Sequence, residues 1–528
     1  MSIQDAPVSL RAAAMHGGDP RALLDSMPPR YSQLVKRWAD LTPERPALIC
    51  DGVTHTYGEL WTATLAAIDL LRANGVGGGD RVLFLAENGL QVTPLLLAAS
   101  ELDVWAAPLN ARMSQREVSV IRDFADCRTA VYCVGDSAAA VEHAALAGAE
   151  TIEHPLLGRL AIGPQRPDAQ PEPVQPDKAL QTAVLVFTSG TTGEPKGVML
   201  SHQALMYMGA NMVALRGVRP DDCFYNSSPV SHAIGLGTVL MTAFWAGASA
   251  ELVARFTPAH LAMALVEDRI SSVTAVPTLF LRLLEHAEAT GAAITSKRLR
   301  SIATAGAPLD LTLKARIEAA LGVGMSQSYG LTECNPIARS PGPVDDNEVG
   351  AIQPGVEIRL VREDGKDAAA DEIGEIWVKG PTRMLGYFRN PTATQAVMRD
   401  GGWLNTGDLA LMDDHGKLRI IGRSKELIIR SGFNVYPVEV EGVLGLCPGV
   451  AAAAVVGRSV EGNEEVVAFV QALPGHALEV SDLTAWSEAR LAPYKRPAEI
   501  IIVPDMPIGP TGKIMKIRLK ERLAGATA

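Results

Sequence analysis

The sequence predicts an α/β protein, with a large N-terminal α/β domain of mostly parallel sheets and a small α+β C-terminal domain. Its 528 residues exceed the roughly 250–300 residues that one hydrophobic core supports. As far as about residue 420, short β-branched runs alternate with helical patterns, which is typical of βα units around parallel sheets. The pattern then changes, which indicates a second folding unit.

Five apolar runs of the N-terminal region end in the same way. Each finishes in Gly, Pro, Ser or Thr residues, and the runs span 81–89, 182–190, 271–278, 299–308 and 325–333. In open α/β sheets, ligands bind beyond the carboxyl ends of the strands, where loops and helix N-termini present polar groups. We therefore expect a binding site where these segments meet.

Two other N-terminal segments have a distinctive composition. Residues 233–250 carry no formal charge, but glycines, Thr238 and Ser249 dilute their hydrophobicity. A buried helix is therefore favoured over a membrane span, which needs ~20 predominantly apolar residues. Residues 164–177 are rich in proline and predict an extended surface linker.

The C-terminal unit begins after a turn, a short strand and a charged turn at 413–425. A strand, a helix that starts with proline at 437–446, and apolar strands at 450–456 and 465–473 follow. We therefore divide the chain into domains 1–424 and 425–528.

Composition limits the classes of partner. The formal net charge of −11 argues against a nucleic-acid partner, because phosphate contacts need a basic face. The six cysteines are scattered without CxxC spacing, which argues against a disulfide framework and favours a reducing compartment. The first residues do not have the pattern of a signal peptide. We expect a cytoplasmic enzyme without a membrane span, and the sequence leaves its oligomeric state open.

The strongest chemical signal is FTSGTTGEPKG at 187–197. Glycines let backbone N–H groups approach a polyphosphate, hydroxyls donate hydrogen bonds, and a lysine adds a point charge. The string is not a Walker A loop, since Pro195 stands where the second glycine belongs. We expect a nucleotide polyphosphate to be bound by Thr188, Ser189, Gly190, Thr191, Thr192 and Lys196.

This string resembles the signature of the adenylate-forming superfamily, which includes acyl-CoA synthetases, 4-coumarate–CoA ligases, firefly luciferase and the adenylation domains of peptide synthetases. Further motifs appear in the family's order, so the resemblance extends over roughly residues 30–520. It implies the adenylate-forming enzyme fold with a mobile C-terminal domain. It also implies ATP, Mg²⁺ and coenzyme A as cofactors.

Residues 326–333, SQSYGLTE, resemble the family's Tyr-Gly-x-Thr-Glu element. Tyr329 offers an aromatic face for adenine, and Thr332 can hydrogen-bond the α-phosphate. Glu333 provides a carboxylate of the kind that holds Mg²⁺ beside phosphates. The same element adds Gln327, Ser328 and Gly330 to the expected nucleotide contacts. Gly306, Ala307 and Pro308 are expected to contact the nucleotide as well, because they resemble the family's turn that lies against adenine and the acyl pocket.

Three expected functional residues lie before or at the domain boundary. Asp408, in a Thr-Gly-Asp element, suits the two ribose hydroxyls, as a carboxylate does in dinucleotide sites. Arg423 is implied by the resemblance to contact the ribose or the phosphates. Lys425 falls at the family's hinge, about which the C-terminal domain pivots between two half-reactions.

The remaining assignments rest on the resemblance. Lys513 corresponds to the lysine that reaches the acid carboxylate and the α-phosphate, and its context suggests a target of a lysine acetyltransferase, which would delete its charge. Gly432 and Phe433 are assigned to the pantetheine tunnel of coenzyme A. His232, in a Pro-x-x-His-x-x-Gly element, is expected to line the acyl pocket.

We therefore predict an AMP-forming acid–thiol ligase, an acyl-CoA synthetase that converts a small carboxylic acid to its adenylate and transfers the acyl group to coenzyme A. Glycines at 233–237 suggest room for an aromatic or medium-chain acid. Arg282 leaves a dicarboxylate, malonate-type ligase as an alternative. A stand-alone adenylation enzyme that loads a carrier protein is a second alternative, although 229–238 lacks the acidic residue that would pair with a substrate ammonium.

Overall fold

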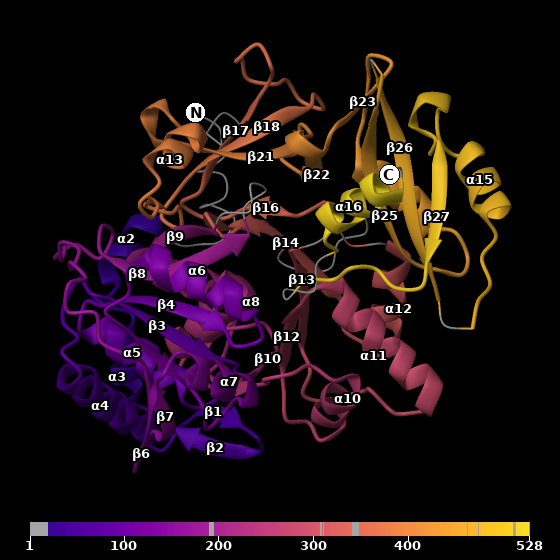
Figure 1. The fold of residues 1–528 in the computed structure, drawn as a ribbon. Helices are drawn as coiled ribbons and strands as arrows, with labels where there is room; N and C mark the ends of the chain where they lie inside the picture. Colours follow the sequence, from indigo (N-terminus) through magenta and orange to yellow (C-terminus); the bar gives the residue numbers. More distant parts are fainter. Residues whose placement is uncertain are drawn as a thin grey trace.

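The computed structural model describes residues 19–189, 195–306, 309, 311–340, 348–461, 463–473, 475–509 and 514–526. In the view of Figure 1, the first part of the chain builds the lower left of the molecule and the yellow C-terminal part lies at the upper right. The third sheet, drawn in orange, lies above the first two.

The first sheet has eight strands within the described residues, in the order β19-β9-β8-β4-β3-β5-β7-β6. The pairs β3–β4, β3–β5 and β4–β8 are parallel, and the outer pairs are antiparallel. The strands are β3 (Arg81–Ala86), β4 (Trp105–Asn110), β5 (Thr129–Tyr132), β6 (Glu150–His154), β7 (Gly158–Ile162), β8 (Thr182–Ser189), β9 (Pro195–Ser201) and β19 (Gly386–Tyr387).

The second sheet has nine strands within the same described ranges, in the order β16-β15-β14-β13-β12-β10-β11-β1-β2. Its centre is parallel and its edges are antiparallel. The strands are β1 (Pro46–Cys50), β2 (Val53–Thr56), β10 (Cys223–Asn226), β11 (Ser249–Leu252), β12 (Ser272–Ala275), β13 (Ser301–Ala305), β14 (Met325–Leu331), β15 (Cys334–Arg339) and β16 (Ala351–Ile352).

A third sheet of antiparallel strands follows, which the sequence patterns did not reveal. Its order is β17-β18-β21-β20, and β22 pairs with β21. The strands are β17 (Glu357–Val361), β18 (Gly374–Lys379), β20 (Met398–Arg399), β21 (Trp403–Met412) and β22 (Leu418–Arg423). Side chains from all three sheets, such as Phe84, Ala338 and Ile376, belong to one buried apolar cluster.

Helices cover the sheets and begin at recognisable caps. Helix α4 starts after Thr56, whose hydroxyl accepts from the Glu59 N–H at 3.2 Å while the Glu59 carboxylate accepts from the Thr56 N–H at 2.8 Å. The helices up to residue 426 are α2 (Pro20–Ser26), α3 (Ser32–Leu41), α4 (Tyr57–Ala73), α5 (Val92–Glu101), α6 (Gln115–Ala125), α7 (Ala138–Leu146), α8 (His202–Arg216), η2 (Ile234–Leu240), α9 (Met241–Ala246), α10 (Pro258–Val266), α11 (Pro277–Thr290), α12 (Leu311–Leu321), α13 (Pro391–Val397), η3 (Asp400–Gly402) and η4 (Ser424–Glu426).

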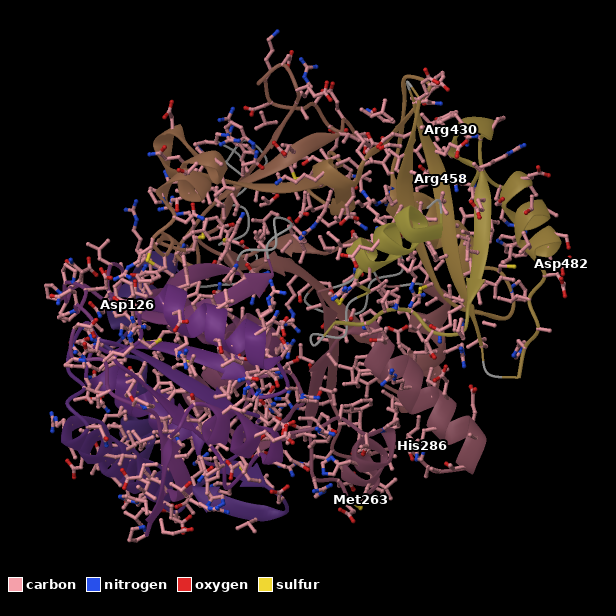
Figure 2. The ribbon with its side chains drawn as sticks, in the orientation of Figure 1. Asp126, Met263, His286, Arg430, Arg458 and Asp482 are labelled. Atoms are coloured by element: carbon pink, nitrogen blue, oxygen red, sulfur yellow. The ribbon has the colours of Figure 1, made fainter. Side chains whose placement is uncertain are left out.

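The two distinctive N-terminal segments keep their predicted character. The π-helix η2 and helix α9 are almost wholly buried, as expected of 233–250. Among the described residues, none of the helices has the length and apolar character that crossing a membrane requires. The 164–177 segment is mostly exposed, but it is fastened to the first sheet: buried Arg81 donates to the carbonyl of Gln170 and lies 3.4 Å from the carboxylate of Asp126, which Figure 2 labels.

The segment after η4 has its own sheet and its own core. The hairpin β23 (Ile428–Arg430) and β24 (Phe433–Val435) precedes the sheet β25-β26-β27. Its other elements are α14 (Pro437–Gly445), β25 (Val450–Val460), β26 (Asn463–Ala472), α15 (Val480–Glu488), η5 (Pro493–Lys495), β27 (Glu499–Val503) and α16 (Lys516–Ala526). Two buried clusters consist only of residues from this segment, for example Val440 with Val466, and Phe469 with Leu519.

Candidate adenylation site

The predicted phosphate-binding segment lies on a hairpin of the first sheet. Strands β8 and β9 pair antiparallel, with Thr188 opposite Lys196 and Ser189 opposite Pro195. Gly190, Thr191 and Thr192 lie outside the described residues. The hairpin therefore brings the first hydroxyl of the motif and its lysine to the same end of the two strands.

The side chain of Tyr387 contacts both Lys196 and Glu333, a carboxylate that follows strand β14 of the second sheet. The Nζ atom lies 5.1 Å from the ring centroid of Tyr387, within the range of a cation–π contact. The Tyr387 hydroxyl donates a 2.7 Å hydrogen bond to Oε1 of Glu333. Burial and the neighbouring Glu333 carboxylate raise the pKa of Tyr387, so the hydroxyl stays protonated and acts as the donor.

Glu333 and Thr332 lie in the turn between β14 and β15, and both are half-buried. One Glu333 oxygen accepts from Tyr387, and the other accepts no hydrogen bond from the residues that the structure describes. No cluster of three or more metal-ligating side chains occurs within the described ranges. A single carboxylate beside the predicted phosphate-binding hairpin fits Mg²⁺, which usually takes one or two protein carboxylates with phosphates and water.

A second polar cluster joins the second and third sheets. The Tyr329 hydroxyl at the end of β14 donates to Oδ2 of Asp408 at 2.6 Å, and Arg423 Nε lies 3.0 Å from Oδ1. Asp408 and Arg423 are opposite each other on β21 and β22. The pKa of Tyr329 is raised by burial and by the Asp408 carboxylate, and that carboxylate also raises the pKa of Arg423.

The part of β21 before Asp408 is held by polar side-chain contacts. The Thr406 hydroxyl donates to the Ile376 carbonyl at 2.9 Å and accepts from the Asp408 N–H at 3.0 Å. Glu375 accepts from Asn405 at 2.6 Å and from Ser424 at 3.0 Å. The acidic side chain of Asp408 is thus presented on a fixed backbone.

The strands β13 and β14 carry the remaining nucleotide candidates at their carboxyl ends. Gln327 is buried with its N–H bonded to the Ser340 hydroxyl, and Ser328 lies opposite Ala305 of β13. A Cβ on Gly330 would lie 2.6 Å from the Asn335 amide oxygen, so a larger residue there would displace that side chain. Gly306 follows β13 with φ +84°, whereas Ala307 and Pro308 lie outside the described residues.

His232 occupies a turn that leads into η2. The turn is tied to β10 and β3, because Asn88 accepts from the Val230 N–H and donates to the carbonyls of Asn226 and Ser228. His232 is half-buried, and its carbonyl accepts from the Leu236 N–H. Added Cβ atoms on Gly235 and Gly237 would lie 2.3 Å from the Pro229 carbonyl and 2.4 Å from the Met208 sulfur. These glycines therefore permit close packing of the chain on itself, and the room for an acyl group stays a prediction.

The residues assigned to the hinge and the coenzyme A tunnel lie at the start of the C-terminal segment. Lys425 is exposed in η4, between β22 and β23. Gly432 has φ +80° at the tip of the β23–β24 hairpin, and Phe433 is 55% exposed and stacks on Tyr494 at 4.7 Å. Arg430, labelled in Figure 2, donates to the carbonyls of Tyr494 and Arg496 and so fixes this hairpin to the domain. Lys513 lies outside the described residues.

Two family matches cover most of the chain. The AMP-binding enzyme family matches residues 35–388, and the AMP-binding enzyme C-terminal domain matches residues 439–513. The chain belongs to the AMP-binding enzyme family.

Curated relatives and solved structures agree with this membership. The chain is 32% identical to a feruloyl-CoA synthase of Amycolatopsis sp over 92% of its length and 97% of that protein. It is 32% identical to an indoleacetate–CoA ligase of Aromatoleum aromaticum, over 94% of the chain and 98% of that protein. MatB from Rhodopseudomonas palustris has a TM-score of 0.79 in its ATP-bound form, at 28% identity over 93% of this chain and 98% of that one. The TM-score is 0.70 for the apo form, at 29% identity and the same two coverages.

This AMP-binding enzyme is therefore an ATP-dependent, AMP-forming ligase of the acyl-CoA synthetase class. The predicted superfamily, fold class and activity class are confirmed. The roles of individual residues stay predictions.

Sequence reasoning missed three residues that shape the site of this AMP-binding enzyme. Tyr387, Glu375 and Asn335 make their contacts through pairings that join distant parts of the chain. Of these three residues, only Tyr387 has a local sequence signal: it follows Gly386 and precedes Asn390 and Pro391, where α13 starts. This pattern predicts a turn before a helix, but it does not predict that the Tyr387 hydroxyl contacts Glu333.

Proposed function

We propose that this ligase activates an aromatic or medium-chain carboxylic acid with ATP and Mg²⁺ and passes the acyl group to coenzyme A. The observation that carries the proposal is a pair of polar clusters, Lys196–Tyr387–Glu333 and Tyr329–Asp408–Arg423. Tyr329 and Glu333 belong to the same stretch of chain, at the end of β14 and in the turn that follows it. The first cluster has the chemistry to receive phosphates, and the second has the chemistry to receive a ribose. The names of the curated relatives, which act on aromatic acids, support the choice of acid.

In the first half-reaction, the acid carboxylate attacks the α-phosphorus of ATP and pyrophosphate leaves. Lys196 and the 188–192 segment bind the leaving phosphates, while Asp408 and Arg423 hold the ribose. Thr332 and Lys513 stabilise the charge that develops on the α-phosphate. Glu333 would hold Mg²⁺, which would supply further positive charge to the phosphates. Positioning and electrostatics dominate, since the chemistry needs no covalent intermediate with the enzyme.

In the second half-reaction, the coenzyme A thiolate attacks the acyl carbonyl, a C–S bond forms, and the C–O bond to AMP breaks. We propose that residues 425–528 pivot about Lys425, so that Lys513 withdraws and Gly432 and Phe433 approach the acyl group. A domain with its own core and an exposed hinge lysine supports this motion. The higher similarity to the ATP-bound than to the apo form of MatB supports an arrangement suited to adenylation.

His232 is the residue that we propose for the wall of the acyl pocket. Its turn is fixed by Asn88, and the turn precedes the buried η2 helix. The dicarboxylate alternative depends on Arg282, whose side chain is exposed on α11. An exposed arginine in water gains little from a single carboxylate, so an uncharged acyl group is favoured.

Two further proposals concern regulation and location. Acetylation of Lys513 by a lysine acetyltransferase would remove the charge needed for adenylation, and an acetylated form with full adenylation activity would contradict this. We also expect the enzyme in the cytoplasm, where its six free, buried cysteines suit a reducing compartment.

The acid is tested with a panel of substrates. Pyrophosphate release and thioester formation are measured with hydroxycinnamates, arylacetates, medium-chain acids, dicarboxylates and amino acids, with coenzyme A or a carrier protein as acceptor. The proposal expects turnover with aromatic or medium-chain acids and coenzyme A. Turnover confined to dicarboxylates, or transfer only to a carrier protein, would support one of the alternatives instead.

A further inference from the structure

Residues 384–388 connect the turn of the second sheet that carries Glu333 to the β8–β9 hairpin of the first sheet that carries Lys196. At one end, the Met384 N–H donates to the Glu333 carbonyl at 2.7 Å. At the other end, the Phe388 N–H donates to the Gly197 carbonyl at 2.7 Å, and Tyr387 lies opposite Val198 of β9. The segment therefore fixes the backbone of Glu333 relative to the backbone beside Lys196.

The side chain of Tyr387 also connects the Glu333 carboxylate with the Lys196 ammonium. It is buried, its hydroxyl donates to Glu333, and the face of its ring lies under the Lys196 ammonium at 5.1 Å. Its backbone is fixed as well, because its N–H donates to the Thr394 hydroxyl at 2.9 Å. One side chain thus contacts both groups expected at the triphosphate.

These two contacts suit a positioning role. A hydrogen bond to a carboxylate fixes which oxygen is free, and here it leaves the second oxygen of Glu333 for another ligand. The ring face attracts the Lys196 ammonium without neutralising it, so the charge stays available to phosphates. A carboxylate in place of the ring would instead form an ion pair and reduce that charge.

We propose that Tyr387 is a positioning residue, which sets the Glu333 carboxylate and the Lys196 ammonium in the geometry that receives the metal-bound triphosphate of ATP. The inference rests on the proposed role of Glu333 at the metal. Tyr387 does not touch the reacting atoms in this account. It acts through the two residues that do the binding.

The test compares Tyr387→Phe with a matched control, Tyr31→Phe. Both hydroxyls are buried donors, but Tyr31 donates at 2.6 Å to the Leu96 carbonyl, between α3 and α5. For each variant we would measure the Mg²⁺ concentration that half-saturates pyrophosphate exchange. We would also measure Mn²⁺ binding by electron paramagnetic resonance in the presence of a non-hydrolysable ATP analogue, which needs no turnover. Melting temperature reports the structural cost.

We expect Tyr387→Phe to raise the half-saturating Mg²⁺ concentration and to weaken Mn²⁺ binding by about tenfold, as the loss of one hydrogen bond to a charged group predicts. The KM for the acid should not change. Tyr31→Phe should leave both metal measurements at the wild-type value. Equal metal dependence of Tyr387→Phe and the wild type, or an equal shift in Tyr31→Phe, would overturn the proposal.

A third variant separates this inference from the proposed function. Glu333→Gln should shift the metal dependence at least as far as Tyr387→Phe, because it removes the carboxylate itself. If Glu333→Gln shifts it and Tyr387→Phe does not, the positioning role fails and the metal role of Glu333 stands. If neither variant shifts it, the metal role of Glu333 fails as well.

Discussion

Replacing Asp408 by asparagine tests the proposed ribose site, because the change keeps the size of the side chain and removes its charge. The carboxylate is 5% exposed, accepts from the Tyr329 hydroxyl at 2.6 Å, and lies 3.0 Å from Arg423 Nε. A carboxylate offers about four acceptor positions. The ribose hydroxyls of ATP are donors, and a carboxylate has the chemistry to accept from them.

The expected loss follows from these contacts. A hydrogen bond to a charged group contributes about 1.5–3 kcal/mol, so ATP binding should weaken by roughly tenfold to 100-fold. The ion pair with Arg423 contributes less to folding, since the arginine side chain is 58% exposed and water screens it. We therefore expect unfolding free energy to fall by no more than about 1 kcal/mol from loss of that pair.

Pyrophosphate exchange is measured with ATP and with 2′-deoxy-ATP. Loss of ribose recognition lowers the ratio of the two rates, whereas a general loss of activity lowers both rates equally. The wild type should prefer ATP, and Asp408→Asn should lose most of that preference. Asp413→Asn is the control, because Asp413 lies at the far turn of the same β21–β22 hairpin, where it accepts from the N–H groups of His415 and Lys417. Retention of the full preference for ATP by Asp408→Asn would refute the assignment.

Two further predictions concern coenzyme A transfer and stability. Phe433→Ala removes a ring that stacks on Tyr494 at 4.7 Å, and it should slow thioester formation in a single turnover by about tenfold while adenylate formation stays unchanged; equal slowing of both steps would contradict the tunnel role. The pKa of His202 lies well below its usual 6.5, mainly because burial disfavours the charged ring and also because Arg30 is near. The stabilising contribution of neutral His202 is therefore full above that pH and falls by about 1.4 kcal/mol per pH unit below it, until the pH reaches the folded-state pKa. His202→Gln should remove this part of the pH slope in urea unfolding between about pH 7.5 and about pH 5.5, and an unchanged slope would count against it.

Much of the site follows from local sequence, because its residues sit where strands end. The 182–190 run predicts β8, and the 299–308 and 325–333 runs predict the adjacent parallel strands β13 and β14. The carboxyl ends of neighbouring parallel strands must meet at one edge, so Thr188, Gly306 and Tyr329 can be assigned to strand ends without a structure.

The remaining features depend on pairings that no local pattern contains. Tyr387 reaches Glu333 only because β19 adds to the edge of β9, far away in the sequence. The antiparallel third sheet, which presents Asp408, has the short alternating strands that are hard to distinguish from loops. The close contacts at Gly235 and Gly237 belong to the same class, because a side chain at either position would meet Pro229 or Met208.

The central claim is that a carboxylate displaces pyrophosphate from ATP with the help of a lysine from the C-terminal domain. The direct measurement is acid-dependent exchange of labelled pyrophosphate into ATP by the wild type and by Lys513→Ala, beside thioester formation from a presynthesised acyl-adenylate. The account predicts exchange by the wild type, a loss of about 100-fold to 1,000-fold in the variant, and thioester formation that both retain. Wild-type protein without acid-dependent exchange, or a variant with full exchange, would contradict it.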